Sequence, residues 1–225
     1  KVMFESKYSK VLTVILVIVI IAILALLGFL GYDMYQKYFI ESEAAAFVED
    51  FEKEKEKENE EQNEVADSNV TNPLDQLGET PGGTGNNVNN GKPTYKGFNM
   101  VGTMVIPATN FQYPILEKVT RKSIETAVAV LYGAGVNQVG NTVIIGHNYR
   151  NGLFFSNNKK LNIGDKIYIT DNSGNKLTYT IYNKFETTDT DTSFYQRDTE
   201  GKPEVTLSTC TDDSKNRLII LARAE

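Results

Sequence analysis

Residues 204–222 read EVTLSTCTDDSKNRLIILA and decide the fold of the C-terminal part of the chain. Two apolar runs, 205–210 and 217–222, flank the polar stretch 211–216. β-Branched and apolar residues on both sides of a short polar segment predict an antiparallel hairpin. If the two runs pair across 211–216, Arg217 returns to the level of Cys210.

The same strand signal recurs upstream of this hairpin. Short apolar or alternating runs, separated by Gly, Pro and Asn, predict five further strands, at Met100–Ile106, Tyr113–Leu116, Asn141–Ile145, Lys166–Thr170 and Leu177–Phe185. One helix is predicted at Ser123–Leu131, with Ser123 as its N-cap. Together, seven or eight strands and one or two short helices within residues 94–225 predict a mainly β fold, a closed seven- to eight-stranded β-barrel.

The N-terminal part contains a candidate membrane span. Val11–Leu30 is a run of 20 residues without a charge, and a helix of that length is roughly 30 Å long, the thickness of a bilayer core. A buried core helix is the alternative, but soluble helices normally have a polar face. We therefore predict a transmembrane signal anchor at 11–32, after a flank at 1–10. Lysines precede the run and acids follow it, so the positive-inside rule places the N-terminus in the cytoplasm.

Charge is unevenly distributed between the span and the predicted barrel. Residues 41–67 carry twelve acids against three lysines and account for the net charge of −6, which leaves residues 68–225 nearly neutral. A neutral domain excludes the basic footprint of a nucleic-acid-binding protein. We interpret 33–67 as an acidic, partly helical stalk and the Asn-, Gly- and Pro-containing 68–93 as a flexible linker. The composition break at Pro93 predicts that residues 94–225 fold on their own.

The chain has one cysteine and one histidine, which excludes an internal disulfide and a Cys/His zinc site. Cys210 and His147 each directly follow an apolar strand, and Arg217 opens the last one. A cysteine nucleophile needs a base or cation beside it and donors for an oxyanion, so these residue types suit acyl transfer. The alternatives are a buried structural cysteine, a hydrogen-bonded structural histidine, and a surface ion pair of Arg217 with Asp212 or Asp213.

Two short motifs in the sequence resemble the active-site signatures of the sortase family. They are TLSTC at 206–210 with the following Arg217, and NTVIIGHN at 141–148. The motifs YPIL at 113–116 and LNIGD at 161–165 also lie where sortases carry similar motifs. The resemblance implies a cysteine transpeptidase of the Gram-positive cell surface. Its implied catalytic residues are His147, Cys210 and Arg217, its implied substrate-binding residues are Asn148, Ser208 and Thr209, and it implies no cofactor and no metal.

The resemblance also implies partners and a location. Sortases bind secreted proteins through a C-terminal sorting signal, often LPXTG, and pass them to an amine of a peptidoglycan precursor or a pilin lysine. The chain is thus expected to be a single-pass protein of the cell membrane, held by residues 11–32, with its catalytic domain outside. Residues 146–155 look like class B sortases, whereas the loop lengths are closer to classes A and D.

Four acids, Glu186, Asp189, Asp191 and Glu200, resemble the calcium site of some class A enzymes, but acids in a solvated loop explain them better. Two other functions remain as alternatives. One is a membrane-tethered binding barrel of the sortase type without catalysis, which would need none of Cys210, His147 and Arg217. The other is an L,D-transpeptidase, whose cysteine follows its histidine-containing loop at short distance. Here His147 precedes Cys210 by 63 residues.

Overall fold

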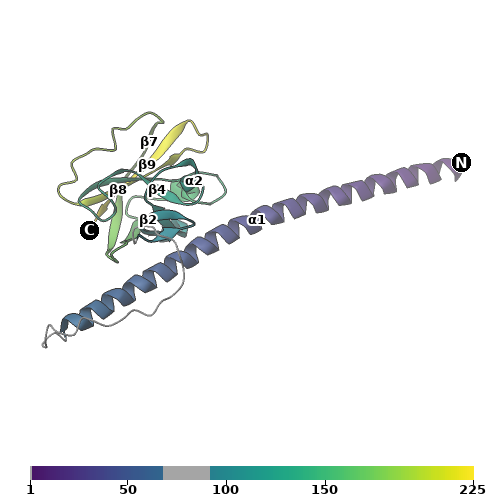
Figure 1. The fold of residues 1–225 in the computed structure, drawn as a ribbon. Helices are drawn as coiled ribbons and strands as arrows, with labels where there is room; N and C mark the ends of the chain where they lie inside the picture. Colours follow the sequence, from purple (N-terminus) through teal and green to yellow (C-terminus); the bar gives the residue numbers. More distant parts are fainter. Residues whose placement is uncertain (1, 68–91) are drawn as a thin grey trace. The chain divides into compact units, whose positions relative to one another are not determined.

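A computed structural model describes residues 2–67 and 92–225 (Figure 1). The predicted linker at 68–93 lies outside the described residues, apart from Lys92 and Pro93. The chain divides into two compact units, Lys1–Ser42 and Glu43–Glu225. The second unit contains all of the strands found in the described residues and, with them, the candidate site.

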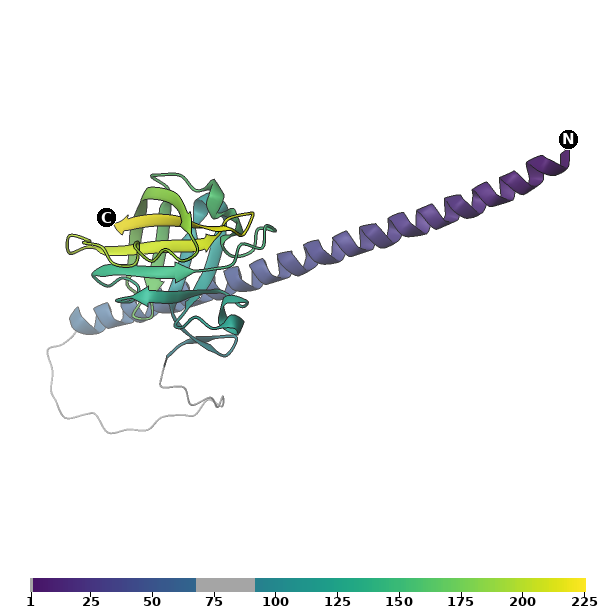
Figure 2. The same cartoon turned by 90° about the horizontal axis from the view of Figure 1, so that it is seen from above.

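The strands of the second unit close into a barrel. Sheet neighbours follow the order β1-β2-β3-β4-β5-β8-β9-β7-β6, and β2 also pairs with β6, so β2 to β9 form a ring of eight strands (Figure 2). This arrangement confirms the predicted closed barrel. The strands are β1 (Thr94–Tyr95), β2 (Phe98–Ile106), β3 (Phe111–Leu116), β4 (Val128–Gly133), β5 (Gly140–Ile145), β6 (Lys166–Asp171), β7 (Lys176–Thr188), β8 (Pro203–Cys210) and β9 (Asn216–Ala224).

Two features of the barrel position the candidate site. Strand β5 runs parallel to β8, so the ends of both strands lie at the same edge of the sheet. Strand β9 returns antiparallel beside β8 and pairs Cys210 with Arg217, as the hairpin at 204–222 predicts. The interior is apolar and closed, with side chains such as Met104, Ile144 and Leu207 fully buried.

The helix predicted at Ser123–Leu131 is wrong over most of its length. Helix α2 covers only Arg121–Ile124, and its N-cap is Thr120, which exchanges capping-box hydrogen bonds with Ser123. The following residues form β4, which pairs parallel with β3 and antiparallel with β5. Val128 and Val130 favour the extended backbone, and sheet pairing on both sides outweighs the helical spacing of the apolar residues.

Helix α1 (Val2–Asp67) begins in the first unit. Within the described residues, it is the one helix that is long and apolar enough to cross a membrane, and the side chains of its apolar window are not buried. The predicted span at 11–32 lies inside it. Helical backbone continues through the predicted stalk to Asp67.

Within the second unit, the later part of α1 packs on the barrel. Ala44, Val48 and Phe51 are buried, and Phe51 belongs to one core cluster with Met100 and Leu116 of the barrel. The sequence-based boundary at Thr94 leaves this segment out of the domain. The few apolar residues that pack on the barrel are scattered among Glu and Lys. Composition alone therefore predicts that this segment is exposed to solvent.

A polar contact fixes the same segment over the seam that closes the barrel. Thr103 of β2 and Thr170 of β6 face each other where these strands pair, and both hydroxyls donate to Glu52 Oε1, at 3.4 and 3.2 Å. The other carboxylate oxygen of Glu52 accepts from Lys176 Nζ at 2.7 Å. Helix α1 therefore carries a hydrogen-bonded acid over the β2–β6 pairing site.

Candidate active site

Cys210 is the last residue of β8 and Arg217 is the second residue of β9. They are direct partners in the antiparallel ladder, and the Arg217 Nη1 donates to the Cys210 sulfur. Side chains of residues paired in this way project from the same face of the sheet. Both side chains are partly buried, so the sulfur is shielded yet reachable. The ladder thus brings a guanidinium directly to a thiol.

His147 follows β5 by two residues and lies in a loop that folds back on itself. The His147 carbonyl accepts from the Phe155 amide at 3.0 Å, and Asn148 forms an isolated β-bridge with Phe154. The imidazole packs against the Tyr149 ring, with centroids 4.8 Å apart. A Cβ on Gly146 would lie 2.8 Å from Val128 and 2.9 Å from the Phe155 ring, so the turn before His147 has room only for glycine.

Two hydrogen bonds tie the His147 strand to the Cys210 strand. The Thr209 hydroxyl donates to the Gly146 carbonyl at 2.7 Å, and the Gly146 amide donates to the Ser208 carbonyl at 3.3 Å. Thr209 is buried, so its hydroxyl is used within the protein. Ser208 lines the pocket in front of Cys210. These two predicted substrate-binding residues thus both line that pocket with buried side chains, and the Thr209 hydroxyl joins two strands.

Asn148, the third predicted substrate-binding residue, contacts the loop that follows Cys210. Its Nδ2 donates to the Cys210 carbonyl and to Asp212 Oδ1, both at 2.9 Å. Asp212 also accepts from Lys159 Nζ at 2.6 Å, and these two hydrogen bonds hold the pKa of the Asp212 carboxyl below its usual value. Asn148 therefore fixes the backbone at the nucleophile.

A cavity of about 330 Å³, here named the Cys210 pocket, joins the three predicted catalytic residues. Strands β4, β5, β8 and β9, helix α2 and the loop between β7 and β8 line it, with the residues Ile124, Leu131, Ile145, Gly146, His147, Asp189, Asp191, Phe194, Tyr195, Ser208, Thr209, Cys210 and Arg217. The aromatic wall of this pocket was not predicted from the sequence. Phe194 and Tyr195 form an aromatic pair inside an otherwise polar loop, and this contrast was the available signal.

The surroundings of His147 favour its neutral form. Burial lowers the pKa of the imidazole first of all, the negative charge of Glu125 acts in the opposite direction, and the positive charge of Arg217 lowers it further. A neutral imidazole can accept a proton, and its conjugate acid is correspondingly ready to give one up. The site thus combines a thiol, a guanidinium donor and a titratable base in one pocket, the set that acyl transfer requires.

The four acids weighed as a calcium site are distributed over different surroundings. Asp189 and Asp191 line the Cys210 pocket, whereas Glu186 lines a separate, smaller cavity. Glu200 pairs with Arg223 at 2.9 Å. Among the residues that the structure describes, no three Asp, Glu, His or Cys side chains gather as ligands for a metal ion.

The eight-stranded barrel places a cysteine at the end of one strand and a histidine two residues beyond the end of its parallel neighbour, an arrangement that suits a cysteine-based acyl-transfer site. A sequence model of the Sortase domain matches residues 104–225, slightly more than half of the chain. The protein therefore belongs to the sortase family.

Known relatives agree with this family. Sortase A of Bacillus anthracis is 31% identical over 124 residues, which span 54% of this chain and 58% of that protein. The Clostridium perfringens sortase D5 transpeptidase structure superposes with a TM-score of 0.52 at 28% identity, over 56% of this chain and 79% of that one. Sortase A from Corynebacterium diphtheriae gives 0.52 at 26% identity, over 57% and 61% of the two chains.

Proposed function

We propose that this protein is a membrane-anchored cysteine transpeptidase. It cleaves an LPXTG-like sorting signal near the C-terminus of a secreted protein and transfers that protein to an amine of the cell wall or of a pilin subunit. The observation that carries the proposal is the hydrogen bond from Arg217 to the Cys210 sulfur, in a pocket that also contains His147. The span at 11–32 holds the enzyme in the membrane, with its catalytic domain at 94–225 on the outer side.

The first half of the reaction forms a thioester. The Cys210 thiolate attacks the carbonyl carbon of the bond to be cleaved, and the developing oxyanion is stabilised by the Arg217 guanidinium. When the tetrahedral intermediate collapses, the carbon–nitrogen bond breaks and protonated His147 gives its proton to the departing amine. The upstream part of the substrate remains bonded to Cys210.

The second half reverses these roles. The acceptor amine attacks the thioester carbonyl, neutral His147 takes the proton of that amine, and the thiolate of Cys210 leaves. The depressed pKa of His147 suits this step, because the neutral form prevails near neutral pH. Hydrolysis is the same step with water in place of the amine.

The test is mass spectrometry of the full chain in detergent, incubated with a small library of sorting-signal peptides. A mass increase that matches the upstream peptide fragment on Cys210 is expected, followed by its transfer when triglycine or a lysine-containing peptide is added. Cys210→Ala should abolish both products while it preserves the thermal transition. A protein that binds these peptides without any cleavage would instead be the non-catalytic binding barrel.

A further inference from the structure

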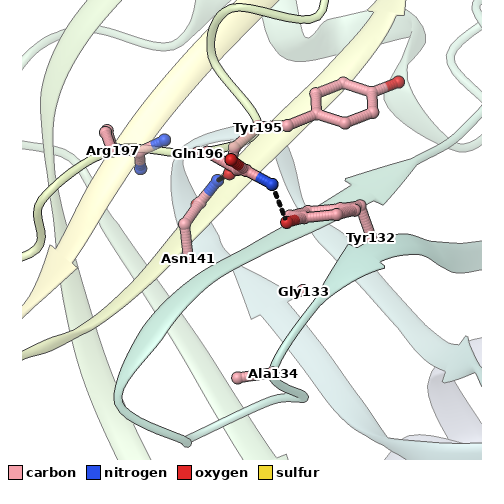
Figure 3. Close-up of a pocket in the computed structure, with 7 residues that line it drawn as sticks. All are labelled: Tyr132, Gly133, Ala134, Asn141, Tyr195, Gln196 and Arg197. Carbon is pink, nitrogen blue, oxygen red and sulfur yellow. Dashed lines mark hydrogen bonds between the residues drawn. The ribbon is translucent and has the colours of Figure 1, made fainter.

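A second cavity, of about 500 Å³, lies next to the Cys210 pocket. It is lined by Tyr132, Gly133, Ala134, Asn141, Tyr195, Gln196 and Arg197 and is here named the Tyr132 pocket (Figure 3). Tyr195 lines both cavities, so they adjoin across this one side chain. Nothing in the proposed chemistry at Cys210 uses the Tyr132 pocket.

The two cavities lie on one face of the sheet. Side chains of a strand alternate between its faces, so Asn141, Val143 and Ile145 of β5 share the face that carries Ser208 and Cys210 of β8. Asn141 lies opposite Glu204, six residues before Cys210. At about 3.3 Å per residue, the Tyr132 pocket is therefore roughly 20 Å from the nucleophile, measured along the strand.

The position of His147 sets the direction in which a substrate runs. His147 lies beyond the C-terminal end of β5, whereas Asn141 lies at its beginning. The departing amine must be next to His147 to receive its proton, so the leaving segment points away from the Tyr132 pocket. The upstream segment, which stays on Cys210, runs toward Tyr195. In extended conformation, its fifth to seventh residues before the cleaved bond reach the Tyr132 pocket.

The lining of this pocket suits a peptide. The rings of Tyr132 and Tyr195 are 5.3 Å apart, and Gln196 Nε2 donates to the Tyr132 hydroxyl at 2.7 Å, as the dashed line in Figure 3 shows. Because this hydroxyl accepts from Gln196, its own hydrogen is available to donate to a ligand carbonyl. The rings supply apolar surface for a side chain.

Hydrogen bonds to buried residues fix the loop that forms one wall of the Tyr132 pocket. Buried Asn141 donates through Nδ2 to the carbonyls of Phe194 and Tyr195, at 3.2 and 2.9 Å. Arg197 donates through Nε to Glu204, a fully buried carboxylate, at 2.6 Å. These contacts fix the loop that carries Tyr195 and Gln196 against β5 and β8. The pocket is thus preformed, and a peptide that enters it need not first order the loop.

We propose that the Tyr132 pocket binds the peptide segment immediately upstream of the sorting signal. This inference rests on the proposed function, and it extends the recognised sequence beyond the four residues that an LPXTG-type signal places before the cleaved bond. Discrimination among secreted proteins then depends in part on the residues that precede the signal.

The test compares two peptides on the full chain in detergent. One is acetylated at the first residue of the signal, and the other carries Ala-Tyr-Ala before it. We expect kcat/KM for the extended peptide to be about fivefold to tenfold higher, mainly through KM. Tyr132→Phe and Gln196→Ala should each remove most of this advantage and leave the short peptide unaffected. Gln112→Ala, the same truncation on β3, should change neither.

Binding to the Cys210→Ala variant separates this inference from the proposed function. Tighter binding of the extended peptide, lost in the additional Tyr132→Phe variant, supports the Tyr132 pocket even if the wild-type protein cleaves neither peptide. Absence of cleavage alone counts against the transpeptidase. Equal affinity of Cys210→Ala for both peptides, or equal kcat/KM for both in the wild type, overturns the pocket assignment.

Discussion

The Arg217 guanidinium and the Cys210 sulfur are joined by a hydrogen bond between two residues that face each other in the β8–β9 ladder. The ladder fixes both backbones, so this contact does not depend on the turn at 211–216. Asp212 and Asp213, the alternative partners of Arg217, hydrogen-bond elsewhere: Asp212 with Lys159 and Asn148, and Asp213 with Thr211. The guanidinium of Arg217 thus hydrogen-bonds to the predicted nucleophile, Cys210, and not to these two acids.

The hydrogen bond between Arg217 and Cys210 predicts a large effect of Arg217→Lys on catalysis. Lysine keeps the charge but cannot present the planar fork of donors, and loss of an oxyanion donor typically costs 10²–10³ in rate. We expect kcat/KM to fall at least about a hundredfold, with Tm changed by only a few degrees. Thioester formation and thermal denaturation should be measured on the same sample. Activity within threefold of the wild type would reduce the site to Cys210 and His147.

The pKa of His147 provides a second prediction, which NMR titration of the only histidine can test. We expect a value below the ordinary 6.5, because burial disfavours the imidazolium. Glu125→Gln should lower the pKa further, since it removes the opposing negative charge. Arg217→Met should raise it, whereas Arg217→Lys, which keeps the positive charge, should leave it nearly unchanged. A rise in Glu125→Gln would contradict this account of the site.

The same shift predicts how stability depends on pH. Because the folded protein binds the His147 proton less tightly than the unfolded chain, the unfolded state carries more protons between the lowered pKa and about 6.5. Stability should therefore fall as the pH is lowered through this window. In His147→Gln this contribution disappears, so the stability difference between variant and wild type should change with pH only there. A difference that is constant from pH 5 to 8 would argue against a depressed pKa.

Asn148 distinguishes substrate binding from positioning of the nucleophile. Its two hydrogen bonds, to the Cys210 carbonyl and to Asp212, predict that Asn148→Ala lowers kcat about tenfold with little change in KM. Lys159→Ala, which removes the other partner of Asp212 without touching Cys210, serves as the control and should stay close to the wild type. A rise in KM at unchanged kcat would restore Asn148 to the substrate-binding role that the family resemblance implies.

Strands were predictable from this sequence because their signal is local. Alternation and β-branched residues mark β6, β7, β8 and β9, and the parallel pairing of β5 with β8 explains why their ends bear His147 and Cys210 together. Strand β4 was not predictable in this way. Its apolar residues Val128 and Leu131 also fit a helical face, and only pairing with β3 and β5, distant in sequence, decides for the strand.

In the candidate site, too, some residues could be identified from the sequence alone, whereas the contacts of others depend on the fold. Cys210, His147 and Arg217 are chemically distinctive, and two of them are unique in the chain, so they could be singled out. The substrate-binding role of Thr209 and Asn148 stays a prediction, and their observed hydrogen bonds run to Gly146, Cys210 and Asp212. Nothing in a single sequence shows which backbone group a side chain will face, because that depends on how two loops meet.

The last prediction concerns α1, which includes the acidic stalk that composition predicts at 33–67. Phe51 is only 6% exposed and packs with Met100 and Leu116, so Phe51→Ala should destabilise the second unit by about 3 kcal/mol. Phe39→Ala, at an exposed position of the same helix, is the matched control and should have little effect. Chemical denaturation of both variants measures the difference.

Truncation tests the same packing without a point substitution. A fragment that starts at Glu43 should unfold cooperatively, whereas one that starts at Thr94 lacks Phe51 and the Glu52 contacts to Thr103, Thr170 and Lys176. We expect the shorter fragment to be less stable and to bind a hydrophobic dye over the exposed cluster around Met100. If both fragments melt at the same temperature, the helix lies on the barrel without stabilising it. The sequence-based boundary at Pro93 would then describe the folding unit correctly.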